Sequence, residues 1–175
     1  MKIFGWVFAI AGAVVLSGCS ELMSLHSFVG DEDSAADPGL AGTWKSSDDE
    51  ALIIVQQAGA IYSITYTEKK ETAKFQGRLI RAGDAEILDV VEESDDAFQI
   101  PAHLMVRVWP EGGVLRFTFL DSKWLRALAA QQLASQPSGE RTLITAPADA
   151  VRSFVLRYGA DPKAFEGNPS VLVRQ

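Results

Sequence analysis

The sequence is poor in the residues that build disulfides and metal centres. Among its 175 residues, Cys19 is the only cysteine, and His26 and His103 are the only histidines. One cysteine cannot form a disulfide within the chain. Two histidines with no thiolate or further histidine beside them do not supply the usual ligands of a zinc site. The sequence therefore predicts neither a metal centre nor a cofactor.

Motifs of enzyme chemistry are missing as well. The chain has no Gly-x-Ser-x-Gly turn for a nucleophile, no glycine-rich phosphate loop and no dinucleotide fingerprint. A Ser-His-Asp site would have to use His103, and the sequence shows no nucleophile for it. Basic residues are also in the minority, because 16 Lys and Arg face 23 Asp and Glu. The sequence therefore predicts a protein that is not an enzyme and does not bind nucleic acid.

The N-terminal apolar run is too short to span a membrane. It extends over 14 residues, Ile3 to Leu16, whereas a spanning helix needs roughly 20. Lys2 precedes it and small residues follow it, which is the pattern of a secretory signal that is removed.

The residues at the end of this run, Leu16-Ser17-Gly18-Cys19, resemble the lipobox of bacterial lipoproteins. The resemblance implies diacylglyceryl transfer to the Cys19 thiol, cleavage before Cys19 and acylation of the new amino group. The lipid then anchors the protein to a membrane of the bacterial cell envelope. In that family an aspartate after the cysteine favours the inner membrane, so Ser20 favours the outer membrane. An ordinary secretory signal with a chance cysteine is the alternative.

We expect the chain to divide into three segments. They are a removed signal peptide (1–18), a lipid-anchored acidic stem (19–39) and one domain (40–175). The stem carries five acidic residues and no Lys or Arg, whereas the domain has 18 acidic and 15 basic residues. Apolar residues of the stem such as Phe28 are able to contact either the bilayer or the domain.

Alternating apolar and polar residues predict short antiparallel strands in the first two-thirds of the domain. In one of them Tyr62, Ile64 and Tyr66 share a face. The predicted strands are 52–55, 61–67, 74–81, 87–91, 98–109 and 114–120. Such a meander is typical of a barrel or half-barrel.

The last third is predicted to contain two helices. Asp121 is a suitable N-cap for a helix over 122–134, and a second helix has Pro147 in its first turn and ends at Gly159. The segment between them, 135–140, is expected to be a loop. Short strands are predicted at 142–145 and 171–173. The fold class is therefore mainly β (α+β), an antiparallel meander followed by two C-terminal helices.

The segment Gly42-Thr43-Trp44, before the first predicted strand, resembles the Gly-x-Trp signature of the lipocalin and calycin barrels. In that family the tryptophan packs across one end of the barrel, and the glycine lets the chain bend closely there. The resemblance implies a lipocalin-like barrel in which Gly42 and Trp44 are structural residues. It also implies that the domain binds something apolar or a partner protein.

The predicted strand 98–109 carries the candidate ligand-binding residues. One face has Phe98, Ile100, Leu104, Val106 and Val108, and the other has His103, Met105, Arg107 and Trp109. We predict that the second set contacts a ligand in a cavity, although alternation alone leaves open which face points inward. For His103 the alternative is a histidine that is hydrogen-bonded on a sheet face.

Asp89 is a carboxylate within an otherwise apolar strand. If it points inward it needs arginine or backbone donors, because an unpaired buried carboxylate is costly. The candidate arginines are Arg78, Arg81 and Arg107. The acidic cluster at 92–96 is expected to be a solvated hairpin tip, since it lacks the glycine and the distal glutamate of a calcium-binding EF-hand loop.

Two functions are compatible with these features. The first is a membrane-tethered, non-enzymatic binding module for a small apolar or amphipathic ligand, which requires a cavity of roughly a few hundred cubic ångströms. Aromatic strand residues favour it: Tyr62, Tyr66, Phe75, Phe117 and Phe119. The alternative is a structural or assembly lipoprotein that docks another envelope protein. It predicts a filled barrel and an exposed apolar patch around Trp109 or Trp124.

Overall fold

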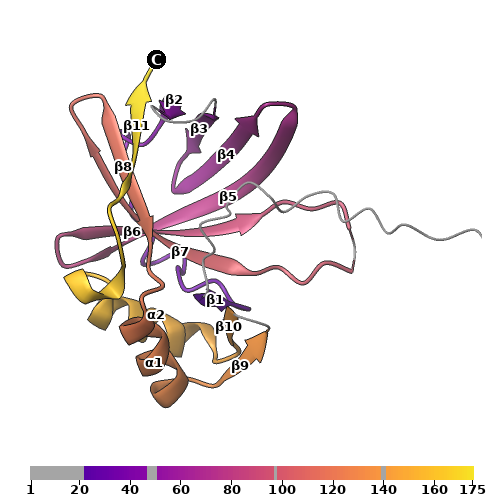
Figure 1. The fold of residues 1–175 in the computed structure, drawn as a ribbon, viewed down its shortest axis with the longest axis vertical. Coiled ribbons are helices and arrows are strands. Elements are labelled where there is room, and N and C mark those ends of the chain that lie inside the picture. Colours follow the sequence, from indigo (N-terminus) through magenta and orange to yellow (C-terminus); the bar gives the residue numbers. More distant parts are fainter. Residues whose placement is uncertain (1–21, 47–50, 97, 139–140) are drawn as a thin grey trace, which may run out of the picture.

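The structure is a computed structural model and describes residues 22–46, 51–96, 98–138 and 141–175 (Figure 1). The predicted signal peptide, Cys19 and Ser20 lie outside the described residues. Within the described residues, no helix has both the length and the apolar character needed to cross a membrane.

The described chain forms short strands with two helices near its C-terminal end. The strands are β1 (Leu22–Ser24), β2 (Gly42–Ser46), β3 (Leu52–Ala58), β4 (Ile61–Glu68), β5 (Glu71–Ala82), β6 (Ala85–Glu92), β7 (His103–Glu111), β8 (Val114–Phe119), β9 (Ser135–Ser138), β10 (Arg141–Ile144) and β11 (Ser170–Arg174). The helices are α1 (Lys123–Gln132), α2 (Ala148–Tyr158) and the short 3₁₀ helix η1 (Pro162–Ala164).

Eight of these strands close into an antiparallel barrel. β2 to β8 pair consecutively, and β11 pairs with both β8 and β2. In β11, Val173 lies opposite Lys45 of β2 and opposite Val114 of β8. The C-terminal strand thus joins the two edges of the meander. The predicted barrel with two C-terminal helices is confirmed, and the barrel is closed rather than a half-barrel.

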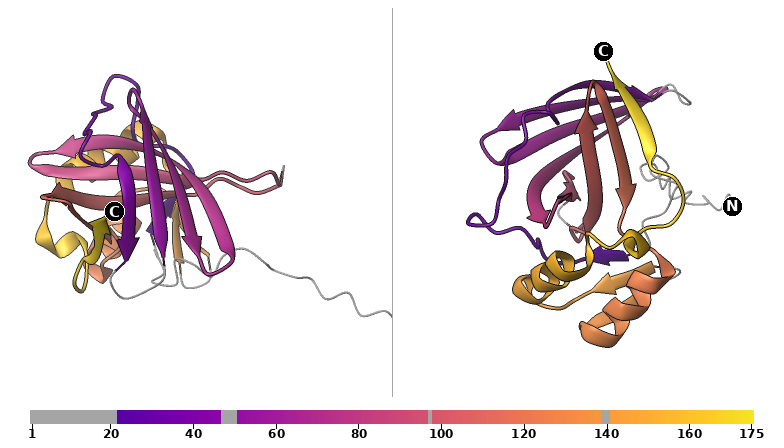
Figure 2. Two further views of the ribbon diagram at one scale, coloured as in Figure 1. Left: turned by 90° about the horizontal axis from the view of Figure 1, so that it is seen from above. Right: turned by 90° about the vertical axis from the view of Figure 1, so that its left-hand side faces the viewer.

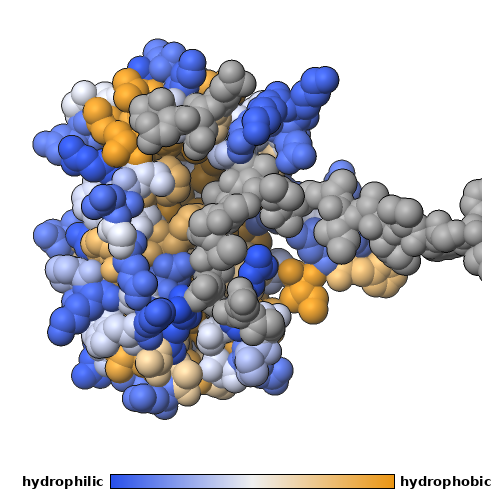
Figure 3. All heavy atoms as spheres, in the orientation of Figure 1, coloured by the Kyte–Doolittle hydropathy of each residue, from blue (hydrophilic) through white to orange (hydrophobic). Residues whose placement is uncertain are grey.

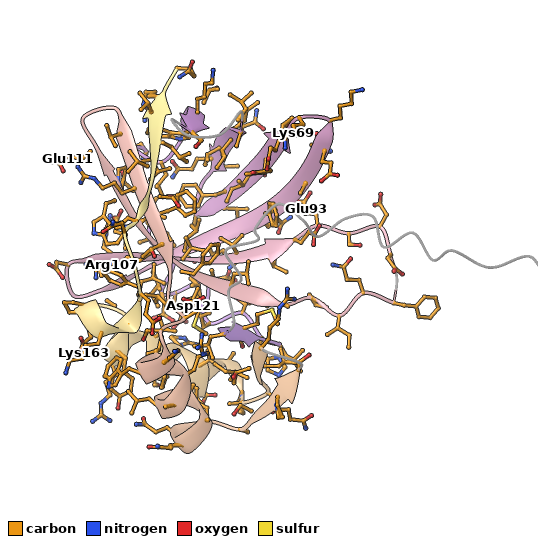
Figure 4. The ribbon with its side chains drawn as sticks, viewed as in Figure 1. Lys69, Glu93, Arg107, Glu111, Asp121 and Lys163 are labelled. Atoms are coloured by element: carbon orange, nitrogen blue, oxygen red, sulfur yellow. The ribbon has the colours of Figure 1, made fainter. Side chains whose placement is uncertain are left out.

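The two ends of the barrel differ because the strands alternate in direction. The turns β3–β4, β5–β6 and β7–β8 lie at one end, and the connections β2–β3, β4–β5 and β6–β7 lie at the other. In Figure 4, Glu111 marks the first end, and Lys69 and Glu93 mark the second. Residues 35–41 cross the first end, where the Ala35 N–H donates to the Leu79 carbonyl at 2.8 Å. We call this the closed end and the other the open end.

Trp44 covers the closed end of the barrel. Its side chain is 1% exposed, and its indole Nε1 donates to the Leu40 carbonyl at 2.9 Å. The guanidinium of Arg174 stacks on the ring at 4.3 Å and donates to the Ala41 carbonyl. Gly42 has a φ of 153°, which strains any other residue, and an added Cβ would displace the same guanidinium. Trp44 thus packs across one end of the barrel, and the structural role implied for Gly42 and Trp44 stays a prediction.

Residues 22–39 belong to the folded domain, which corrects the predicted extent of the stem. Leu22 and Phe28 are fully buried, and Val29 is also buried. β1 pairs with the first residues of β7 and, in parallel, with β10. The reason is physical: although this segment is acidic overall, its apolar residues gain more from burial against the barrel than from a solvated stem.

A second apolar core lies outside the barrel, between its wall and the helices, which occupy one side of the molecule (Figure 2). The wall contributes Ile80, Ile87 and Met105, and α2 contributes Val151 and Phe154. The wall formed by β5, β6 and β7 is therefore covered by apolar groups on both of its faces.

Three predicted boundaries differ in the structure. β7 begins at His103 rather than at residue 98. Ser122, not Asp121, caps α1, because the Ser122 hydroxyl accepts from the Leu125 N–H at 3.1 Å. The predicted loop after α1 contains the edge strand β9, which pairs with β10 and so satisfies part of its backbone hydrogen-bonding groups despite a loop-like composition.

Candidate functional site

The interior of the barrel holds a cavity of about 110 Å³. Its lining is made by side chains from seven of the eight barrel strands and from the crossing segment: Leu40, Ile53, Val55, Tyr62, Ile64, Tyr66, Phe75, Leu88, Val90, Leu104, Val106, Val108, Leu115, Phe117, Phe119 and Leu172. All five aromatic residues singled out in the sequence belong to it. The cavity is smaller than the few hundred cubic ångströms expected, and its volume matches a short apolar group rather than a whole lipid.

The lining offers no free polar group to a ligand. Its only hydroxyls belong to Tyr62 and Tyr66, and both are engaged elsewhere. The Tyr62 hydroxyl accepts from the Asp37 N–H at 2.7 Å, and the Tyr66 hydroxyl donates to the Glu68 carboxylate at 2.8 Å. A polar group inside this cavity would lose its hydrogen bonds to water without replacement. The chemistry of the cavity therefore selects hydrocarbon or aromatic groups.

The cavity is less well covered towards the open end. Leu40 and Tyr62, next to the crossing segment, are buried, with exposed fractions of 2% and 0%. Phe75, Leu104 and Phe119 lie next to the connections of the open end and are only half-buried. A ligand would therefore enter between these half-buried residues, and we call them the mouth.

The four predicted ligand contacts lie on the outer face of β7 and do not line the cavity. Met105 belongs to the core beneath the helices. Arg107, marked in Figure 4, stacks on Trp109 at 4.7 Å and donates to the Ala160 carbonyl at 3.3 Å. Trp109 packs edge-on against Phe165. The structure brings Arg107 and Trp109 together, but it separates all four residues from the cavity by the barrel wall. Their role in ligand binding stays a prediction.

The half-buried His103 and the buried Asp89 form a pair on the same outer face. The two side chains meet at 2.7 Å between His103 Nδ1 and Asp89 Oδ1. The other oxygen, Asp89 Oδ2, accepts from the Ser27 hydroxyl at 2.6 Å and from the Phe28 N–H at 3.1 Å. The interpretation of His103 as a hydrogen-bonded histidine on a sheet face is confirmed. The arginine partners predicted for Asp89 are wrong, since Arg78 binds Asp31, Arg81 binds Glu86 and Arg107 donates to the Ala160 carbonyl. A backbone donor, the other kind of partner expected, is present in the Phe28 N–H.

The arrangement around Asp89 is suited to holding a segment rather than to nucleophilic catalysis. The Ser27 hydroxyl donates to the carboxylate and not to the imidazole, whereas a serine nucleophile is activated by a direct hydrogen bond to histidine. Asp89 instead ties residues 27 and 28 to the wall of the barrel. The sequence missed this contact because it joins positions about 60 residues apart.

The acidic cluster after β6 is exposed. Glu92, Glu93, Asp95 and Asp96 all face solvent, as expected for a hairpin tip. Across the described ranges, no group of three or more His, Cys, Asp or Glu side chains is placed to hold a metal ion.

Tyr62 gives the closed end a pH dependence that is open to test. Its side chain is fully buried, and burial, which opposes the phenolate, raises the pKa of Tyr62 above its usual value of 10.0. A raised folded pKa means that the contribution to stability is complete below pH 10 and is lost as the pH rises through that pKa. Near neutral pH, we expect the free energy of unfolding of Tyr62→Phe to be about 0.5–1.5 kcal/mol lower than that of the wild type. Above pH 10, we expect the variant to lose less of its stability than the wild type does.

Urea unfolding between pH 8 and 11 measures this difference. Tyr158→Phe is the control, because the Tyr158 hydroxyl bonds Gln132 at an exposed position. If the wild type and Tyr62→Phe lost equal stability above pH 10, ionisation of the buried Tyr62 phenol would not be the cause of the loss at high pH.

The described residues define a class of protein: a closed, eight-stranded antiparallel barrel with a small apolar cavity and a helical layer on one side. Comparison with protein-family models, with curated protein sequences and with solved structures found no match to this chain.

Proposed function

We propose that this protein is a non-enzymatic lipoprotein of the bacterial cell envelope, anchored through Cys19, whose lipocalin-like barrel binds an apolar group. Ser20 favours the outer membrane. The observation that carries the binding function is the cavity of about 110 Å³, lined without any charged side chain and least covered at one end. Its size favours one slender acyl chain, inserted by its end, or a single ring.

The alternative, docking of another envelope protein, has weaker support. The apolar patch predicted for it does not form around Trp109 or Trp124. Both side chains are half-buried and pack edge-on against neighbours of the same chain, Phe165 and Tyr158. The exposed apolar residues lie elsewhere, and we return to two of them below.

Filling the cavity is expected to abolish binding. Val106→Phe adds a ring to a lining position that is 7% exposed, and we expect the affinity for a fluorescent fatty acid to fall by about tenfold or more. The matched control is Arg107→Ala, one residue along β7 and on the outer face. It is expected to bind as the wild type does. Fluorescence titration of the three proteins, each with its fold verified by circular dichroism, makes the measurement.

The opposite pattern would reject the cavity as the site. If Arg107→Ala lost binding while Val106→Phe retained it, the ligand would lie on the outer face, among the residues first predicted from the sequence.

A further inference from the structure

The connection between β6 and β7 projects beyond the rim of the barrel at its open end (Figure 1). We call its described residues, 93–96 and 98–102, the arm. Phe98 is 94% exposed and Ile100 is 70% exposed, whereas the other exposed large hydrophobic residues of the described chain reach at most 44%. Figure 3, which has the orientation of Figure 1, shows apolar atoms protruding at the right of the molecule, where this connection extends. Two large apolar side chains at one protruding tip mark a contact surface.

Local hydrogen bonds hold the tip in this form. The Phe98 N–H donates to the Asp96 carboxylate at 2.9 Å, and the Gln99 N–H donates to the Asp96 carbonyl at 3.0 Å. The Asp96 N–H in turn donates to the Ser94 hydroxyl at 3.1 Å. The N–H groups of Asp96, Phe98 and Gln99 therefore have partners, while the side chains of Phe98 and Ile100 are exposed.

The described chain begins at the same end of the barrel as the arm. β1 pairs with the first two residues of β7, with Met23 opposite Leu104 and Ser24 opposite His103. The described chain therefore starts beside the base of the arm. Cys19 precedes Leu22 by three residues, which reach about 10 Å when extended. Acyl chains on Cys19 would bring the bilayer to the open end.

We propose that the arm inserts Phe98 and Ile100 into the bilayer, so that the open end of the barrel faces the membrane. This proposal rests on the lipid anchor of the proposed function. It also places the mouth where an acyl chain passes from the bilayer to the cavity without crossing bulk water. The acidic residues beside the tip, Glu92, Glu93, Asp95 and Asp96, are accompanied by no Lys or Arg in the arm. The contact therefore favours zwitterionic over anionic lipid.

Quenching of tryptophan fluorescence by brominated acyl chains tests the insertion. The mature protein is reconstituted in phosphatidylcholine vesicles as Phe98→Trp and, separately, as Ile61→Trp. Ile61 is 38% exposed and starts β4 at the closed end, so it is the matched control. The native tryptophans contribute the same background to both proteins. We expect at least twofold stronger quenching of the tryptophan at 98 than at 61, and a decrease when phosphatidylglycerol replaces part of the phosphatidylcholine.

Equal quenching at the two positions would overturn the proposal. A contact of the tip with a partner protein would then replace the contact with the bilayer. The intact mass of the same samples tests the anchor separately. If the mass showed no acyl chains, the anchor would fail, and the same two variants would be measured with added vesicles. Stronger quenching at 98 would still support insertion of the arm, and equal quenching would again overturn it.

Discussion

Replacing Trp44 by alanine is expected to lower the free energy of unfolding by about 3–5 kcal/mol. The side chain is 1% exposed at the closed end of the barrel, so its removal leaves a cavity that the surrounding strands cannot fill. The substitution also removes the indole donor to the Leu40 carbonyl and the surface on which Arg174 stacks. The crossing segment and the last strand thereby each lose their contact with the indole ring.

Urea unfolding followed by circular dichroism measures this loss without relying on tryptophan fluorescence. Trp109→Ala is the control, because it removes the same side chain from a half-buried position on the outer wall. We expect a clearly smaller loss there. If the two variants lost equal stability, Trp44 would not have the special structural role that the Gly-x-Trp resemblance implies.

Replacing Asp89 by alanine is expected to lower the free energy of unfolding by about 3 kcal/mol, because it leaves more than one polar group of the protein interior without a partner. The carboxylate is 4% exposed and accepts hydrogen bonds from Ser27 and from the buried Phe28 N–H, in addition to His103. The alanine variant leaves the Phe28 N–H without a partner, and an unsatisfied buried donor alone costs about 1–3 kcal/mol.

Asp31→Ala provides the matched control for this prediction. Asp31 also joins the N-terminal segment to the barrel, through Arg78, but its side chain is 90% exposed. Exposed ion pairs contribute about 0–1 kcal/mol. A loss below about 1 kcal/mol for Asp89→Ala in urea unfolding would show that residues 22–39 are not held by this cluster.

Much of the barrel could be predicted from the sequence, because alternation along a strand is a local property. The strands containing Tyr62, Phe75 and Phe117 were recognised in this way, and these residues do point inward. The closure of the barrel could not be predicted. β11 has a single buried residue, Leu172, and its two pairings are decided by a register with strands far away in the sequence.

The site could be predicted only as a choice between two faces. On β7 both faces are rich in apolar residues, since Val106 points into the barrel while Met105 is buried under the helices. Alternation correctly divides the residues of β7 between two faces. It does not show which face points into the barrel when both faces of the sheet are covered. The buried contact of Asp89 was missed for a related reason. Two of the groups that bind Asp89 come from residues 27 and 28, in the acidic segment that the sequence predicts to be a stem.

Native mass spectrometry of residues 20–175, produced in a bacterial periplasm and purified gently, tests the central claim that the barrel carries an apolar ligand. The account predicts a reproducible non-covalent mass that organic extraction removes and that Val106→Phe lacks. A clean apo mass, together with no uptake from a panel of fatty acids, phospholipids and small aromatic compounds, would contradict it.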